Sequence, residues 1–199
     1  MFSLEDLLGQ QGGNEALQQI SNMLGADQNT TDSAIQIALP VILSGLANNA
    51  STPQGAQSLN NALEQDHNGG LLDMLGGFLG GGTAQSRQTD GGGILGHILG
   101  NKQGQVAQEI SNKSGMDLGQ VAKLLITLAP IVMAYLGKQK QKNDLDAGGI
   151  SDLLTGQQQK MQSTGNPMID LATRMLDKDG DGSALDDLAS MAAGYFTNS

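Results

Sequence analysis

Two apolar stretches decide the fold: AIQIALPVILSGLA at residues 34–47 and VAKLLITLAPIVMAYL at residues 121–136. No stretch of the chain alternates with the period of two expected of a strand, and apolar residues recur three and four apart. Each stretch is shorter than the roughly 18–20 residues of a membrane span, and each contains proline and polar residues. We therefore predict an all-α protein with these stretches as buried core helices and no transmembrane segment. The helical spacing is clearest at Ala16, Ile20, Met23 and Leu24 and at Val121, Leu124, Leu125 and Leu128.

An internal repeat links the two stretches. When the sequence is shifted by 90 residues, 14–47 aligns with 104–137 without a gap. Eight of the 34 aligned positions are identical, against about two or three expected from average composition. The identical pairs are Gln18/Gln108, Ile20/Ile110, Ser21/Ser111, Asn22/Asn112, Gly25/Gly115, Asp27/Asp117, Pro40/Pro130 and Leu46/Leu136.

The shared residues predict the same helix–turn–helix in both copies. The glycine suits a left-handed C-cap that ends the first helix. The aspartate two residues later suits a loop or N-cap position before a longer apolar helix. The proline falls inside that longer helix, where it removes a backbone donor and should kink it. We place the two long helices at about 30–49 and 117–139.

A second match, offset by 79 residues, aligns GGLLDMLGG (69–77) with GGISDLLTG (148–156), each beginning with a Gly-Gly turn. The first copy has extra residues before this segment. They read STPQGAQSLNNAL (51–63) and predict an additional helix, with Thr52 as its cap and Pro53 in its first position.

These patterns divide the chain into four parts. Two related helical units, 1–79 and 94–156, are expected to pack in one bundle-like core, because neither can bury its apolar face alone. The Gly-rich segment 80–93 is expected to be a linker between them. Residues 164–199 are expected to form a separate C-terminal helix–loop–helix.

The C-terminal part carries a candidate calcium site in LDKDGDGSALDDL (176–188). Its first half reads D-x-D-x-D-G-S, the opening of an EF-hand-type loop, in which alternate oxygen ligands converge on one ion. The expected ligands are the carboxylates of Asp177, Asp179 and Asp181 and the backbone carbonyl of Ser183. The flanking stretches 166–176 and 185–196 read as the incoming and outgoing helices.

The second half of the loop departs from the usual pattern. The twelfth position, normally a bidentate Glu, is Leu188. We expect Asp187 to complete the site, with Asp186 as the alternative and as a charge at the start of the outgoing helix. Two other interpretations remain: a solvated acidic turn without an ion, and a magnesium site. The short, single loop resembles those of dockerins.

Composition excludes several function classes. The net charge of −10 disfavours nucleic acid and anionic lipid surfaces. The chain has no Cys and only two His, His67 and His97, so thiol chemistry and multi-histidine metal centres are excluded. Neither histidine lies at an aligned repeat position, and both read as loop or interface residues. The run Lys138, Lys140 and Lys142 reads as cations at a helix C-terminus.

Taken together, the G-x-D turns after ISN (21–27 and 111–117), the proline-containing helices, the segment GGLLDMLGGFLGGG (69–82) and the terminal LDKDGDGSALDDLASMAAGYF resemble a bacterial family known as domain of unknown function 937. The resemblance implies a helical fold and a C-terminal Asp-rich loop. It implies no activity.

No nucleophile, base and orienting group come together in the sequence, so we expect a protein without enzymatic activity. The favoured function is a structural or interaction protein, stabilised by Ca²⁺ and self-associating as a homo-oligomer, with filament or surface assembly as its extreme form. Segment 69–82 suits helix docking between subunits. The alternatives are a calcium-responsive regulatory or ligand-binding module, an enzyme that uses aspartates and the metal, and a pore.

The compartment follows from two opposing observations. The start MFSLEDLLGQQGGNE lacks the basic and apolar regions of a signal peptide, so the cytoplasm is the default. A lone calcium loop is typically weak, with Kd of about 10⁻⁴–10⁻³ M, as in extracellular modules. Export to the cell surface or medium by another route is therefore the alternative.

Overall fold

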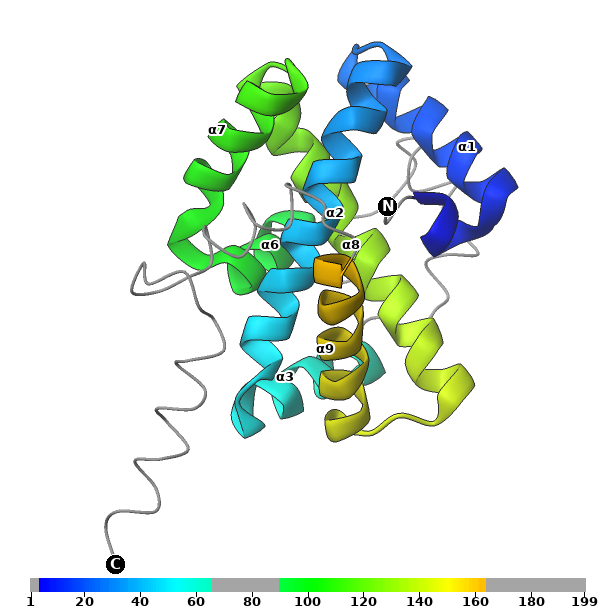
Figure 1. Ribbon diagram of the computed structural model, residues 1–199, viewed down its shortest axis with the longest axis vertical. Coiled ribbons are helices and arrows are strands. Elements are labelled where there is room, and N and C mark those ends of the chain that lie inside the picture. The colour runs from blue at the N-terminus through cyan, green and yellow to red at the C-terminus, as the bar shows by residue number, and fades with distance from the viewer. Residues whose placement is uncertain (1–3, 66–89, 164–199) are drawn as a thin grey trace, which may run out of the picture.

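The two apolar stretches lie in helices α2 (Gln28–Ala50) and α8 (Leu118–Asn143), which run next to each other through the centre of the fold (Figure 1). The structure, a computed structural model, describes residues 4–65 and 90–163. Every element in these two ranges is helical, which confirms the predicted all-α class. The helices around the central pair are α1 (Leu4–Leu24), α3 (Pro53–Gln65), α6 (Gly91–Leu99), α7 (Gln103–Ser114) and α9 (Ala147–Ser163), and a 3₁₀ turn (Gly100–Lys102) joins α6 to α7.

The turns before the two long helices have the predicted residues in the predicted roles. Gly25 and Gly115 adopt positive φ, 64° and 74°, after the last residues of α1 and α7. Asp27 accepts a hydrogen bond from the amide of Thr30 at 3.0 Å, and Asp117 accepts one from that of Gly119 at 2.8 Å. These bonds satisfy amide groups at the start of α2 and α8 that have no partner within the helix. Pro40 and Pro130 both lie inside their helices, and each helix continues past its proline as one element.

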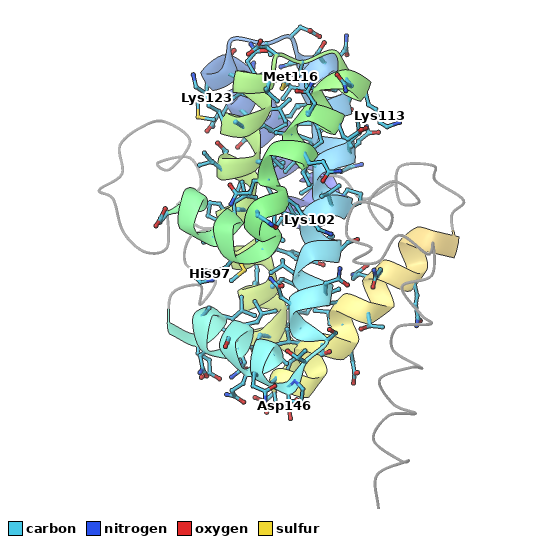
Figure 2. All side chains as sticks on the ribbon, turned by 90° about the vertical axis from the view of Figure 1, so that its left-hand side faces the viewer. His97, Lys102, Lys113, Met116, Lys123 and Asp146 are labelled. Carbon is cyan, nitrogen blue, oxygen red and sulfur yellow. The ribbon has the colours of Figure 1, made fainter. Side chains whose placement is uncertain are left out.

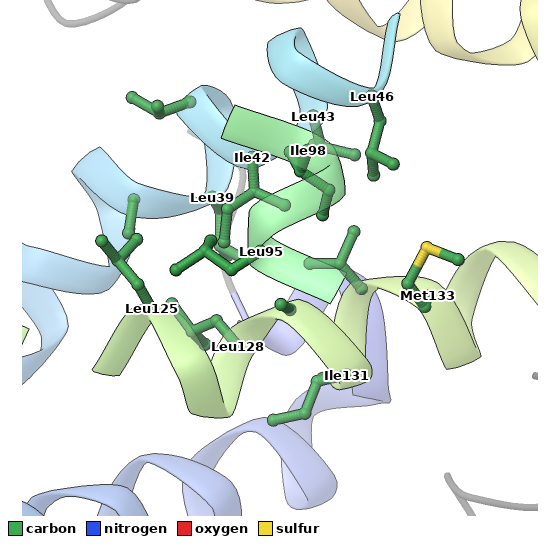
Figure 3. Close-up of a cluster of buried hydrophobic side chains, with 14 of the residues drawn as sticks. Leu39, Ile42, Leu43, Leu46, Leu95, Ile98, Leu125, Leu128, Ile131 and Met133 are labelled. Carbon is green, nitrogen blue, oxygen red and sulfur yellow. The ribbon is translucent and has the colours of Figure 1, made fainter. Parts of the chain in front are cut away.

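The core forms where α2, α6 and α8 meet. Leu39 and Ile42 of α2 point toward Leu125 and Leu128 of α8, with Leu95 of α6 beside them (Figure 3). These five side chains are at most 3% exposed. Burying them removes a large apolar area from water, which is the main force that holds the helices together.

The two halves of the chain interlock around this core. α1 packs against α8 as well as α2, and α7 packs against α2 as well as α8. The Gln120 side chain at the start of α8 donates a hydrogen bond to the carbonyl of Leu24 at 3.0 Å. Neither half therefore completes its packing without the other.

The two central helices are long and apolar, and most of their apolar surface is buried within the fold. Both α2 and α8 are long and apolar enough to span a bilayer by length and composition. However, 78% of the most apolar window of α2 and 61% of that of α8 are buried within the fold. Such burial is typical of core helices, although both helices are longer than the apolar stretches from which their length was predicted.

Several local predictions differ from the structure. Gly148 and Gly149 lie in the first turn of α9 rather than in a turn before it, because Asp146 caps this helix by accepting from the Gly149 amide at 2.8 Å. The last three residues of the expected linker, 91–93, form the first turn of α6, whose N-cap is Asp90. Met23, predicted on the apolar face of α1, is 45% exposed. Residues 69–77, the rest of the linker and the C-terminal part 164–199 lie outside the described residues.

Candidate functional site

The residues of the predicted calcium site all lie outside the described residues. They are Asp177, Asp179, Asp181, Ser183, Asp186 and Asp187. Within residues 4–65 and 90–163, no group of three or more His, Asp or Glu side chains could hold a metal ion. The calcium site therefore stays a prediction from the sequence.

The other polar residues of interest occupy separate places. His67 also lies outside the described residues, whereas His97 is exposed on α6 (Figure 2). Lys140 lies in the last turn of α8, as predicted for the basic run, and its ammonium donates to the carbonyl of Leu145 at 2.6 Å. The same ammonium pairs with Glu64 of α3 at 3.1 Å. The hydrogen bond that Lys140 donates to the Glu64 carboxyl lowers the pKa of that carboxyl, and the bond from Asn60 lowers it further.

One hollow of about 660 Å³ lies between the C-terminal part of α2, α3, α6 and α8. We call it the α3–α6 groove. Its apolar surface is formed by Leu46, Leu59, Ala62, Ile94, Ile98 and Met133, and its polar atoms come mainly from Asn49, Ser58, Asp90 and His97.

Two polar side chains of the groove, those of Asn49 and Asp90, already make hydrogen bonds within the fold. Asn49 donates from its side-chain amide to the carbonyl of His97 at 2.6 Å, which ties the end of α2 to the end of α6. Asp90 accepts from the amide of Gly93 at 3.0 Å and caps α6. The groove offers a ligand more apolar than polar surface, a mixture that is typical of sites that bind by shape and burial with a few oriented polar groups.

A second feature is a row of exposed apolar residues on α8, spaced four apart. It consists of Leu118, Ala122 and Ile126, and we call it the α8 face. Leu118 is 43% exposed and Ile126 is 44% exposed. Lys123 lies beside the row, on the outer surface of the molecule (Figure 2).

The α8 face has no counterpart on α2. The residues of α2 that align with it are Gln28, Asp32 and Gln36, all polar. Both long helices therefore expose one row at equivalent positions, but only α8 fills its row with apolar side chains.

Comparison with known proteins identifies the family. A family model described as bacterial protein of unknown function (DUF937) matches residues 6–139. The chain belongs to this family. The match confirms the resemblance from α1 through most of α8, so the described residues of the DUF937 region include both the groove and the α8 face. It does not extend to the Asp-rich loop at 177–187. No curated protein and no solved structure matches the chain.

Sequence reasoning missed both surface features of this DUF937 protein. The α8 face was detectable in principle, because the repeat alignment pairs Leu118 with Gln28 and Ile126 with Gln36. The groove was not, because its walls come from four helices whose contacts depend on the tertiary packing.

Proposed function

We propose that this protein is a non-enzymatic structural or interaction protein that self-associates through the α8 face. The observation that supports this is the exposure of Leu118 and Ile126 where the aligned residues of α2 are glutamines. Clustered exposed apolar side chains commonly mark interaction surfaces. Single exposed apolar residues are ordinary, but a row of three on one helix face is a docking pattern.

The partner that fits this face is a second copy of the chain. A row along one helix is self-complementary when two copies pair antiparallel about a two-fold axis. The row has Asp117 at its start and Lys123 further along. Antiparallel pairing brings these opposite charges toward each other, whereas parallel pairing places like charges side by side.

Two finer features belong to the same proposal. Helices α1–α2 and α7–α8 are two copies of one unit, as the eight identical aligned residues and the matching turns support. One Ca²⁺ ion, held by Asp177, Asp179, Asp181 and the Ser183 carbonyl with Asp187 or Asp186, fastens the two C-terminal helices. The D-x-D-x-D-G-S pattern supports this assignment.

The test is the molar mass from light scattering after size exclusion, over a concentration series, with millimolar calcium and again with chelator. We expect a concentration-dependent symmetric dimer. The triple variant L118Q/A122D/I126Q, which copies the α2 residues onto α8, should be monomeric with an unchanged helical spectrum. Gln105→Ala, at an exposed position of α7, is the matched control and should still dimerise.

Each result has a defined meaning. A wild-type chain that stays monomeric at high concentration, or a triple variant that still dimerises, would overturn the proposed face. Dimers that form only with calcium would make the Asp-rich loop part of the docking, and would favour a compartment outside the cytosol. Dimers in both conditions would leave the ion a local stabiliser, and Asp179→Ala should then lower the melting temperature without changing the mass.

A further inference from the structure

The α3–α6 groove has a surface that suits a largely apolar occupant. Its surface comes from four helices, with Met133 of α8 and Ile98 of α6 buried and Ile94 partly exposed. Among the described residues that line the groove, Asp90 is the one carboxylate and it caps a helix, and none is Lys or Arg. An anionic ligand would find no Lys or Arg side chain here, and His97 is the one described lining side chain that can carry a positive charge. An apolar helix would bury its side chains against the groove surface.

The chain contains a segment with these properties. Residues 69–79, GGLLDMLGGFL, carry six large apolar residues and one charge, Asp73. Leu71 and Leu75 are four apart, so they share one face in a helix.

A related segment already docks on this bundle. GGISDLLTG (148–156) aligns with 69–77 and forms part of α9, which packs against α2 and α3. Its Ile150 and Leu154, the residues that align with Leu71 and Leu75, are each 1% exposed. Asp152, which aligns with Asp73, is exposed. One copy of this sequence pattern therefore already packs on the bundle, with its two apolar residues buried and its carboxylate exposed.

The chain connectivity brings this segment to the groove. Residues 66–89 connect α3 to α6, which form two walls of the groove, and Asp90 at the start of α6 lines it. At most ~3.3–3.6 Å per residue, residues 80–89 reach roughly 30 Å from Asp90. A tether of this length gives the segment a local concentration of about millimolar at the groove.

We propose that the α3–α6 groove is the intramolecular docking site of residues 69–79, with Leu71 and Leu75 as the anchors. This site shares no lining residue with the α8 face, although Gly91, next to Asp90, contacts Ile126. Its occupancy does not depend on the proposed self-association. The same segment from a second copy is the competing occupant, which the tether disfavours.

The experiment uses the full chain and its lack of cysteine. Ser58 is exposed on the α3 wall of the groove, so the pair S58C/M74C places one thiol beside the groove and one on the segment. The control pair Q18C/M74C keeps the second thiol and moves the first to an exposed position on α1. Disulfide formation is followed at nanomolar protein on non-reducing gels, and the product is assigned as intramolecular or intermolecular by its mass.

We expect the groove pair to close within one chain several times faster than the control pair. Adding Leu75→Asp to the groove pair should slow closure about tenfold, because burial of one leucine changes a docking equilibrium by at least that factor. The helical spectrum reports whether each variant is folded. Equal rates for the two pairs in folded proteins, or cross-links only between chains, would overturn the proposal.

Discussion

Helices α2 and α8 begin with the same aspartate cap and contain the same internal proline, yet their surroundings differ. α2 packs against α1, α3, α6, α7, α8 and α9, and 78% of its most apolar window is buried. The corresponding share of α8 is 61%, and the row from Leu118 to Ile126 faces outward. Related sequences thus give helices of the same local design, while the neighbouring helices determine which apolar side chains are buried.

The largest effect should come from a core residue of α2. Leu39 is fully buried, and the residue of α8 that aligns with it is Ala129. Leu39→Ala removes buried methyl groups and leaves a cavity, which should lower the free energy of unfolding by about 2–5 kcal/mol. Urea unfolding followed by circular dichroism measures this change.

Leu118→Ala on α8 is the matched control, because Leu118 is 43% exposed. It should cost less than about 1 kcal/mol, since its removed atoms already contact water. Equal losses for the two variants would contradict the difference between the helices described above.

The next effect concerns a close contact with α6 that a glycine of α2 allows and that the larger aligned residue of α8 would not allow. Gly45 lies against α6, where an added Cβ would be 2.7 Å from Ile98 Cγ2, and the aligned residue of α8 is Tyr135. Gly45→Ala should therefore force α2 and α6 apart and cost about 1–3 kcal/mol. Thermal and urea unfolding both report the change.

Gly156→Ala provides the control inside α9. An added Cβ there has no neighbour within 4 Å, so better helix propensity should raise stability by about 0.5–1 kcal/mol. A neutral Gly45→Ala beside this gain would mean that α2 and α6 separate easily.

The smallest expected effect on stability comes from the polar contacts near the C-terminal ends of α2 and α8. Lys140 of α8 pairs with Glu64 at 3.1 Å, whereas the backbone carbonyl of Ala50, the last residue of α2, accepts a neutral hydrogen bond from Ser151 at 3.1 Å. The pKa of Glu64 is lowered in the folded protein, chiefly by the hydrogen bond from Lys140. The unfolded chain therefore binds more protons, and the ion pair adds stability at neutral pH that is lost as the pH falls through the lowered pKa.

Glu64→Gln should make stability fall less steeply below pH 5 than in the wild type. Ser151→Ala should instead lower stability by about 0.5–1.5 kcal/mol at every pH. Urea unfolding at several pH values separates the two cases, and parallel profiles for wild type and Glu64→Gln would rule out a contribution from the ion pair.

The sequence predicted the backbone plan because that plan depends on local chemistry. Helix periodicity, the positive-φ glycines at 25 and 115 and the caps at Asp27 and Asp117 depend on residues within one or two turns. The cap of α3 was predictable for the same reason: Thr52 accepts from the Gly55 amide at 3.1 Å, just before Pro53.

Features that depend on distant residues were not predictable in this way. Three consecutive glycines, 91–93, favour a linker by propensity, but the Gly91 backbone packs closely against Ile126 of α8 and α6 starts there. Tertiary packing overrides a weak local preference in this way. The α3–α6 groove needs α2, α3, α6 and α8 together, so no single stretch of sequence encodes it.

The interlocked halves also constrain how this protein can be made. α2 ends at Ala50, but α9, which covers one of its apolar sides, begins only at Ala147. At ~5–20 residues per second, a ribosome needs several seconds to make the intervening chain. During that time the most apolar helix of the first half lacks its later neighbours, a state in which chaperones bind nascent chains. The arrangement that gives the finished protein one shared core thus leaves an apolar helix of the newly synthesised first half partly uncovered until the second half is made.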